Sequence, residues 1–228
     1  KAMEDEYEGI RIQAINHLDA KDRNVRSRSI SILEKLAISD PKTLVQAAAY
    51  EILNEMEYDD ISLFEKGLKS QSFRVQAASA VGVLRLDPSR ISEFLELSDD
   101  VVSSNQELVA ALLDSWIANN DQTKLRIAAE PVAFYLFAKF ENADLGSKLE
   151  RGFNWVLSSN DLASTKIIAN TYSQVYKYYA KDNPSLVQAL NILLDQAIQL
   201  KANAFQSNPD SSYEEQIKVL NEVKADIK

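Results

Sequence analysis

Few side chains in this sequence could perform chemistry. The chain has one histidine, His17, and no cysteine. A zinc site needs three or four His, Cys or carboxylate ligands, and a histidine-dependent triad needs a nucleophile held on a Gly-x-Ser-x-Gly turn, a motif that this sequence lacks. The five glycines stand singly, so they form no phosphate-binding loop. We therefore interpret His17 as a helix-face residue, and we expect no catalytic residue, cofactor or metal ligand within these residues.

Acidic side chains are abundant, and their distribution is uneven. The 34 acidic and 25 basic residues give a net charge of −9. Between Arg90 and Lys124 there is no basic residue but there are seven acidic ones, namely Glu93, Glu96, Asp99, Asp100, Glu107, Asp114 and Asp121. Such a stretch either forms a solubilising surface or produces a negative potential that attracts a basic partner or a cationic peptide. The candidate residues for attracting a partner or peptide are Glu93, Glu96, Asp99 and Asp100. Negative charge disfavours nucleic acid as a partner, despite a small basic patch at Arg23, Arg26 and Arg28.

Aromatic residues are concentrated in the second half of the chain. Tyr172, Tyr176 and Tyr179 follow one another at spacings of four and three, which places them on one helix face. Most aromatic residues at helical spacing belong to a core. Tyrosine also provides a large contact area at a small entropic cost, so these three residues form a candidate docking face.

The elements that carry these residues are predicted to be helices. Four of the five prolines follow Asp or Asn, and this order of residues favours a capped helix start; the pairs are Asp40-Pro41, Asp87-Pro88, Asn183-Pro184 and Asn208-Pro209. Ser212 and Glu215 have the spacing of a capping box. No segment alternates strictly enough to predict a strand. The longest apolar run, 131–138, is too short to cross a bilayer, so we expect a soluble protein without membrane insertion, and the lack of cysteine leaves both cytoplasm and periplasm open.

The first half of the sequence contains a repeat of about thirty residues. The four residues that begin at Val45 recur as the four that begin at Val75, Ile61 and Phe64 recur as Ile91 and Phe94, and a looser copy begins at Ile12. Two helices per unit of 30 to 33 residues are typical of an α-solenoid, in which each unit must stack on the next. We predict an all-α, HEAT-like α-α superhelix of about eleven to thirteen helices. It would be a single domain over 1–228, with regular helix pairs over 1–105 and less regular helices over 106–228 that continue and close the stack.

Residues 64–88 also resemble a known family. This stretch, with Ser72-Phe73, Val75 and the final Asp87-Pro88 turn, is similar to a unit of the C-terminal helical domain of bacterial zinc aminopeptidases of the aminopeptidase N type, and Asp22–Arg26 looks like an earlier unit. The zinc-binding His-Glu-x-x-His motif and the Gly-x-Met-Glu-Asn motif of that family do not occur in this sequence. The resemblance implies a non-catalytic domain that packs on a zinc-containing catalytic domain of the same polypeptide and restricts the access of peptide substrates. The charged helical pattern that follows Lys1 fits this expectation of a longer polypeptide.

Two other functions compete with this interpretation. A free-standing HEAT-like scaffold could bind another protein through its concave face without any catalytic domain. A HEAT-like nucleic-acid enzyme, such as a base glycosylase, is disfavoured because the net charge has the wrong sign. The reading frame that precedes Lys1 discriminates the first two functions, because only an aminopeptidase would contain the His-Glu-x-x-His helix there.

Overall fold

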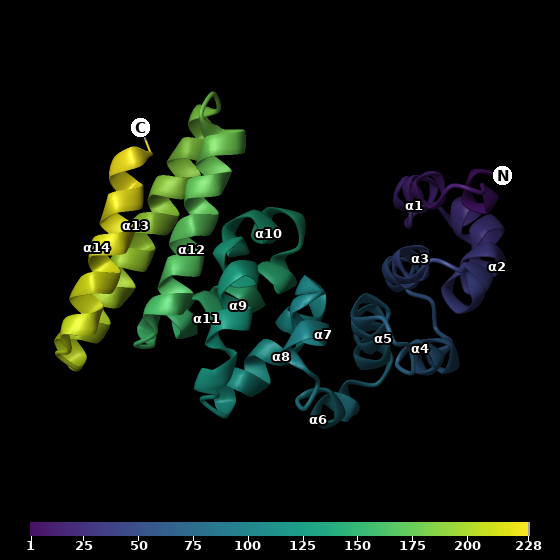
Figure 1. The fold of residues 1–228 in the computed structure, drawn as a ribbon, viewed down its shortest axis with the longest axis horizontal. Coiled ribbons are helices and arrows are strands. Elements are labelled where there is room, and N and C mark those ends of the chain that lie inside the picture. Colours follow the sequence, from purple (N-terminus) through teal and green to yellow (C-terminus); the bar gives the residue numbers. More distant parts are fainter. Residues whose placement is uncertain (228) are drawn as a thin grey trace. The chain divides into compact units, whose positions relative to one another are not determined.

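The computed structural model describes residues 1–227, apart from the side chains of residues 140 and 141, and its secondary structure is entirely helical (Figure 1). Over this range the chain forms fourteen α-helices, a few short 3-10 turns and one π-helical segment, and it forms no strand. The all-α prediction is therefore confirmed. Among the described helices, none combines the length and the apolarity that a membrane span requires.

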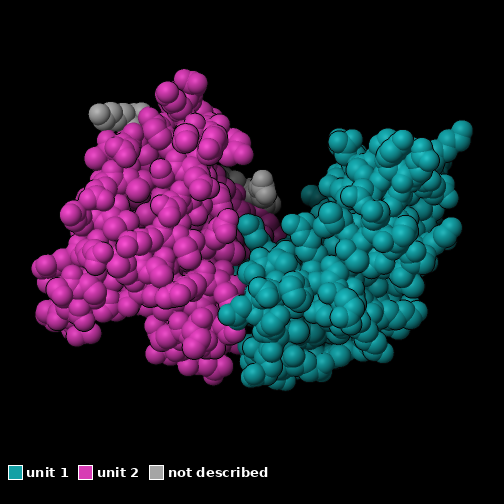
Figure 2. Space-filling view, viewed as in Figure 1, with its two compact units in different colours: residues 1–112 teal, residues 113–228 magenta. Residues whose placement is uncertain are grey.

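Two compact units make up the chain, Lys1–Leu112 (unit 1) and Leu113–Lys228 (unit 2), drawn in teal and magenta in Figure 2. The helices that begin in unit 1 are α1 (Glu8–Asn16), α2 (Arg23–Ser39), α3 (Thr43–Glu55), α4 (Ile61–Gly67), α5 (Phe73–Leu86), α6 (Ile91–Phe94), α7 (Asp99–Ser103) and α8 (Gln106–Ala118). Those of unit 2 are α9 (Leu125–Ala133), α10 (Tyr135–Glu141), α11 (Ala143–Ser158), α12 (Leu162–Val175), α13 (Pro184–Ser207) and α14 (Ser211–Asp226), with the π-helical segment η4 (Tyr176–Ala180) after α12.

The number of helices is slightly larger than the eleven to thirteen expected. Two of the additional elements, α6 and α7, are very short, with four and five residues. In addition, the apolar run over 131–138 is divided at Phe134, which ends α9 and precedes α10. Pro131 lies within α9, where its missing amide weakens the last turn of that helix.

Unit 1 is built from alternating helices in two layers. Helix α3 packs between α1 and α5, and α5 also packs against α7, whereas α2 contacts α3 and α4 and so lies on the other side. Equivalent positions of the two sequence repeats are buried alike, since Val45 and Val75 are both inaccessible, as are Phe64 and Phe94. The thirty-residue repeat of the sequence is therefore matched by equal burial at these positions.

One polar contact recurs with the repeat. The Gln46 side-chain amide donates to the carbonyl of Asp40 at 2.7 Å, and that of Gln76 donates to the carbonyl of Ser70 at 2.5 Å. In both helices the glutamine reaches back six residues and fastens the preceding loop to the first turns of the helix. The recurrence shows that the repeat preserves loop geometry as well as apolar packing.

Gly82 occupies a position in α5 where another helix approaches closely. A Cβ atom added there would lie 2.3 Å from the ring of Phe64, which belongs to α4. Gly67 in α4 has the same function, because its Cβ would meet the hydroxyl of Ser79. A glycine in the middle of α5 therefore has a packing reason: the Phe64 ring fills the space that a side chain would occupy.

Unit 2 is a bundle centred on α12 and α11. Helix α12 packs against α9 and α14, α13 packs against α14 and α11, and α11 packs against α9 and α10. Gly146 lets α11 pass directly over the backbone of α10, since an added Cβ would lie 2.4 Å from the Cα of Lys139. The largest fully buried side chains of this unit include Trp116, Phe153 and Tyr172.

Two of the four predicted proline-marked helix starts are confirmed. Asn183 caps α13, with its side-chain oxygen accepting from the amide of Leu186 at 3.2 Å, and Pro184 is the first helical residue. Asp87 accepts from the amide of Ser89 and opens a 3-10 turn. In both cases a local hydrogen bond alone determines the start, as expected from the sequence.

The other two predicted starts, and the capping box, are wrong. Asp40 ends α2, where its carboxylate forms a buried ion pair with Arg11 at 2.9 Å and accepts from the amide of Lys42 at 2.9 Å. Helix α3 begins at Thr43, so Lys42 and not Asp40 holds the capping position. Asn208 ends α13, and α14 is capped by Asp210, whose carboxylate accepts from the backbone amide of Ser212 at 2.8 Å. Ser212 therefore lies inside the helix, because the carboxylate two residues earlier takes the capping position.

Candidate functional site

The acidic residues singled out in the sequence lie on α6, on α7 and between them. Glu93, Glu96, Asp99 and Asp100 are all exposed to solvent. Arg90 donates two hydrogen bonds of 2.8 Å to Glu93, and these bonds lower the pKa of that carboxyl group. This surface is therefore partly neutralised at Glu93, while its role toward a partner stays a prediction.

A second group of carboxylates lies on α3 and α8, within unit 1. Glu107 and Glu51 are exposed at the surface, but neighbouring atoms partly desolvate their carboxyl groups. This desolvation raises the pKa of Glu107, and repulsion by Glu55 acts in the same direction. It also raises the pKa of Glu51, where Arg74 opposes the shift and Glu107 adds to it. These acids are therefore easier to protonate than isolated carboxyl groups. In the part of the chain that the structure describes, however, no three His, Cys, Asp or Glu side chains are arranged to hold a metal ion.

The three tyrosines of the candidate docking face do not share one exposed surface. Tyr172 is fully buried, and its hydroxyl donates to the carbonyl of Ala133 at 3.1 Å, so it fastens α12 to α9. Tyr176 is half-buried, and Tyr179 is 75% exposed. The prediction is wrong for Tyr172, since its hydroxyl has a buried backbone acceptor that the sequence does not reveal.

Among the described side chains of unit 2, the large exposed aromatic residues are Tyr178 and Tyr179 of the π-helical segment η4. Tyr178, which the sequence analysis did not select, is 66% exposed and carries the Lys177 ammonium over its ring at 5.1 Å. A π-helical turn holds one residue more per hydrogen-bonded ring than an α-turn, which rotates Tyr178 and Tyr179 relative to Tyr172. Single π-helical turns occur frequently at functional sites.

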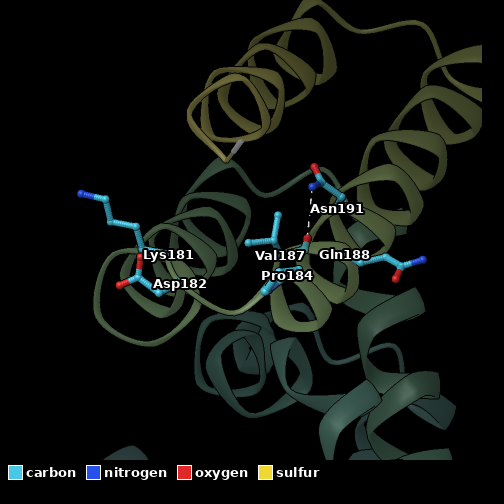
Figure 3. Close-up of a pocket in the computed structure, with 6 residues that line it drawn as sticks. All are labelled: Lys181, Asp182, Pro184, Val187, Gln188 and Asn191. Carbon is cyan, nitrogen blue, oxygen red and sulfur yellow. Dashed lines mark hydrogen bonds between the residues drawn. The ribbon is translucent and has the colours of Figure 1, made fainter.

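A surface hollow lies at the turn between η4 and α13 (Figure 3). Pro184 and Val187 supply apolar atoms from the first turns of α13, and Asn191 donates to the carbonyl of Val187 at 3.1 Å. Figure 3 shows Lys181 and Asp182 in the turn, with the Lys181 side chain directed away from the other lining residues. An apolar floor with charged residues at its rim can receive an apolar side chain of a partner.

Lys201 is the most unusual ionisable residue, and the sequence analysis missed it. It is fully buried in α13, where its ammonium donates to the carbonyl of Ser159 at 2.6 Å and lies 5.7 Å from the centre of the Tyr213 ring. Burial lowers the pKa of Lys201 to about 7, although the carboxylate of Asp161 acts in the opposite direction. The lysine satisfies a backbone carbonyl at the end of α11, so its evident role is structural.

A signal in the sequence could have revealed this buried position. Three apolar residues precede Lys201 in α13 at successive spacings of four, three and four, namely Ala197, Leu194 and Leu190. All three are inaccessible to solvent. This is the spacing of a buried helix stripe. A lysine that continues such a stripe must either extend its amine to solvent or find a buried acceptor, and Lys201 finds one.

The single histidine lies where the sequence suggested. His17 is exposed at the C-terminal end of α1, and its Nδ1 is 2.7 Å from the carbonyl oxygen of Gln13.

No protein-family model, curated protein or solved structure matches this chain. The candidate surfaces for binding are therefore defined by geometry: the acidic residues on α6 and α7, the end of the α12–α13 hairpin, and the exposed apolar residues of unit 1.

Proposed function

We propose that this chain is a non-catalytic, HEAT-like helical repeat that binds polypeptides. The observation that supports the proposal most strongly is the equal burial and equal loop contact of the repeat that includes Val45 and Gln46 and the repeat that includes Val75 and Gln76. A helix pair of this kind buries one face on its neighbours and leaves another face available along the whole stack. Stacked helix pairs therefore provide extended binding surfaces without any reactive group.

Exposed apolar side chains favour a polypeptide as the ligand. The large hydrophobic residues that are at least 43% exposed are Tyr7, Ile10, Ile38, Leu44 and Phe73 in unit 1, and Tyr178, Tyr179 and Ile192 in unit 2. Single exposed apolar residues are ordinary, but groups of them rimmed by polar side chains are typical of protein-binding surfaces. Tyrosine and phenylalanine are also enriched at the centre of protein interfaces.

The first form of the proposal is an accessory domain of a zinc aminopeptidase. It is supported by the resemblance of residues 64–88 and by the Asp87-Pro88 turn that closes this stretch. The domain would pack on a catalytic domain that carries the zinc ion, and the acidic residues on α6 and α7 would attract the cationic amino termini of peptides. The zinc would belong to that catalytic domain and not to the residues of this chain.

The second form is a free-standing scaffold for another protein. It is favoured by the exposed apolar residues at the starts of α3 and α5, because these would serve binding whether or not a catalytic domain is present. The coding sequence that precedes Lys1 separates the two forms. A His-Glu-x-x-His helix in the same reading frame would support the accessory domain, and a reading frame without it would overturn that form and leave the scaffold.

A kinetic experiment tests the accessory domain directly. In a polypeptide that includes the catalytic domain, the combined substitutions Glu93→Gln, Glu96→Gln, Asp99→Asn and Asp100→Asn should raise KM for peptides with a free amino terminus about threefold to tenfold at low salt and leave kcat unchanged, since steering by surface charge is screened by salt. The matched control neutralises four exposed acids of α14, namely Glu214, Glu215, Glu222 and Asp226. An unchanged KM, or an equal effect of the control, would overturn this role of the acidic surface.

A further inference from the structure

The starts of α3 and α5 lie side by side in unit 1 and expose apolar side chains. Thr43, the first residue of α3, lines the same hollow as the four residues Gln71–Arg74 that lead into α5. Leu44 and Phe73 are 45% and 49% exposed at this place. Two successive helix pairs therefore present a large apolar residue at the same end of their first helix.

A second hollow continues this surface toward α2 and α4. Its lining includes Ile38, which is 51% exposed, and Val75 and Tyr50, which are buried and form its floor. Tyr50 is held by a hydrogen bond from its hydroxyl to the carbonyl of Leu63 at 3.2 Å. The floor is thus part of the rigid core of unit 1, and the surface exists before any ligand arrives.

The charge of this surface is opposite to that of the chain. The residues that line the two hollows include three basic ones, Lys66, Lys69 and Arg74, and no acidic one, although Arg74 also interacts with the carboxylate of Glu51 on α3. The whole chain, by contrast, has a net charge of −9. A partner with acidic side chains would therefore find complementary charge here and repulsion over most of the remaining surface.

The backbone at these helix starts adds to the positive potential. Neither Lys42, which precedes α3, nor Ser72, which precedes α5, caps its helix with its side chain. The same is true of α1, α6, α7, α9 and α10, whereas other helical segments of this chain are capped by carboxylate or amide oxygens, as at Asp22, Asp60, Asp87, Asp121, Asn142, Asp161, Asn183 and Asp210. The first amides of α3 and α5 consequently lack a side-chain acceptor, and they carry the partial positive charge of a helix N-terminus.

We propose that this surface, the α3–α5 edge, docks an extended acidic polypeptide segment that carries two large apolar residues. The edge consists of the apolar residues Ile38, Leu44 and Phe73 and the basic residues Lys66, Lys69 and Arg74. The inference rests on the proposed polypeptide-binding function and names its location and the chemistry of the partner. Packed helices are about 8–10 Å apart. An extended chain in the polyproline II conformation advances about 3.1 Å per residue and turns once in three residues, so apolar residues three positions apart lie on one side of the segment, about 9 Å apart, and match two neighbouring helix starts.

A labelled peptide tests the proposal on the full 228-residue chain. The probe is fluorescein-labelled Glu-Leu-Glu-Glu-Phe-Glu, with the two apolar residues three positions apart, and binding is followed by fluorescence anisotropy. One control peptide has lysine in place of each glutamate, and another has serine in place of leucine and phenylalanine. We expect the probe to bind at least tenfold more tightly than either control, and its affinity to fall as salt is raised from 50 to 500 mM.

Substitutions on the chain locate the binding. Phe73→Ser and Arg74→Glu should each lower the affinity for the probe at least fivefold, because each removes an exposed side chain of the edge. The matched controls are Ile192→Ser and Lys218→Glu, which change an apolar residue that is 45% exposed and an exposed lysine, both in unit 2. These controls should leave the affinity unchanged, and far-ultraviolet circular dichroism should show the same helix content for all four variants.

Several results would overturn the proposal. If the lysine peptide binds as tightly as the probe, the charge complementarity is wrong. If the probe binds but is weakened only by the unit 2 controls, the docking site lies elsewhere and the general polypeptide-binding function survives. If none of the three peptides binds at millimolar concentration, or if the chain sediments with anionic phospholipid vesicles and ignores the peptides, the edge does not dock an acidic polypeptide.

Discussion

The substitution Lys201→Met should raise the free energy of unfolding at pH 6 and lower it at pH 10. In the folded chain, burial lowers the pKa of this lysine from its ordinary value of 10.5 to about 7. Between these two values the unfolded chain binds one more proton than the folded chain, so the free energy of unfolding of the natural chain rises with pH. The difference of roughly 3.5 units, at about 1.36 kcal/mol per unit, corresponds to roughly 5 kcal/mol over the whole window.

Methionine removes the charge but also removes the hydrogen bond to Ser159. An orphaned buried carbonyl costs about 1–3 kcal/mol at any pH. At pH 6, where the natural lysine is charged in both states, Lys201→Met should therefore be more stable than the natural chain by about 2–4 kcal/mol. At pH 10 the buried lysine is neutral and hydrogen-bonded, but most unfolded chains still carry the charge, which keeps about 0.8 kcal/mol of the penalty in the natural chain. The variant should therefore be less stable at pH 10 by roughly 0.2–2 kcal/mol.

The assay is urea unfolding at pH 6, 7, 8, 9 and 10, followed by tryptophan fluorescence. Both tryptophans of the chain, Trp116 and Trp155, lie in unit 2, as does Lys201, so the signal reports on the unit that contains the substitution. Lys218→Met, at an exposed lysine of α14, is the matched control and should give curves parallel to those of the natural chain. A difference between Lys201→Met and the natural chain that stays constant from pH 6 to pH 10 would refute the reasoning.

Two further predictions concern the packing and the repeat of unit 1. Gly82→Ala should lower the free energy of urea unfolding by about 1–2 kcal/mol, because the added Cβ would lie 2.3 Å from the Phe64 ring and overpacking outweighs the helix propensity of alanine. Gly9→Ala, which meets nothing within 4 Å, should instead be neutral or stabilise by up to about 1 kcal/mol, and equal effects of the two would contradict the packing argument. Gln46→Ala and Gln76→Ala should each lower the free energy of unfolding by about 1 kcal/mol, because each removes the same kind of loop contact. The two losses should agree within about 0.5 kcal/mol. A loss at only one position would show that the repeat does not extend to this hydrogen bond.

The helical class and the thirty-residue repeat could be predicted because both depend on local patterns in the sequence. Val45 and Val75, and Phe64 and Phe94, occupy equivalent positions in sequence and are equally buried in the structure. The packing role of Gly82 was also accessible, since a glycine within an alanine-rich helix is costly unless another element needs the space. These features depend on residues within about thirty positions of one another.

Long-range contacts explain what the sequence could not predict. Asp40 was expected to cap a helix, but Arg11, 29 residues earlier in the chain, takes its carboxylate into a buried ion pair. Tyr172 has the right spacing for an exposed face, but its hydroxyl finds the carbonyl of Ala133, 39 residues earlier. Spacing identifies which residues share a helix face, whereas only the packing of the whole unit determines which face is covered.

The α3–α5 edge illustrates an intermediate case. Leu44 and Phe73 stand outside the periodic apolar stripe of their helices, so helical periodicity alone predicts no packing role for them. Because the repeat relates the two helices, the sequence does predict that the starts of both helices lie at the same edge of a stack. The basic character of that edge depends on Lys66 and Lys69, which the α4–α5 turn brings to the same surface.

The central claim is that this chain binds polypeptides and does not transform them, and a selection from a random peptide library followed by mass spectrometry tests it most directly. The full chain is used to select twelve-residue peptides, and each enriched peptide is titrated against the chain and then incubated with it. We expect enrichment of acidic peptides with large apolar residues, dissociation constants in the micromolar range and peptide masses that remain unchanged after incubation. Failure to enrich any sequence, or cleavage of the selected peptides by the purified chain, would contradict the account.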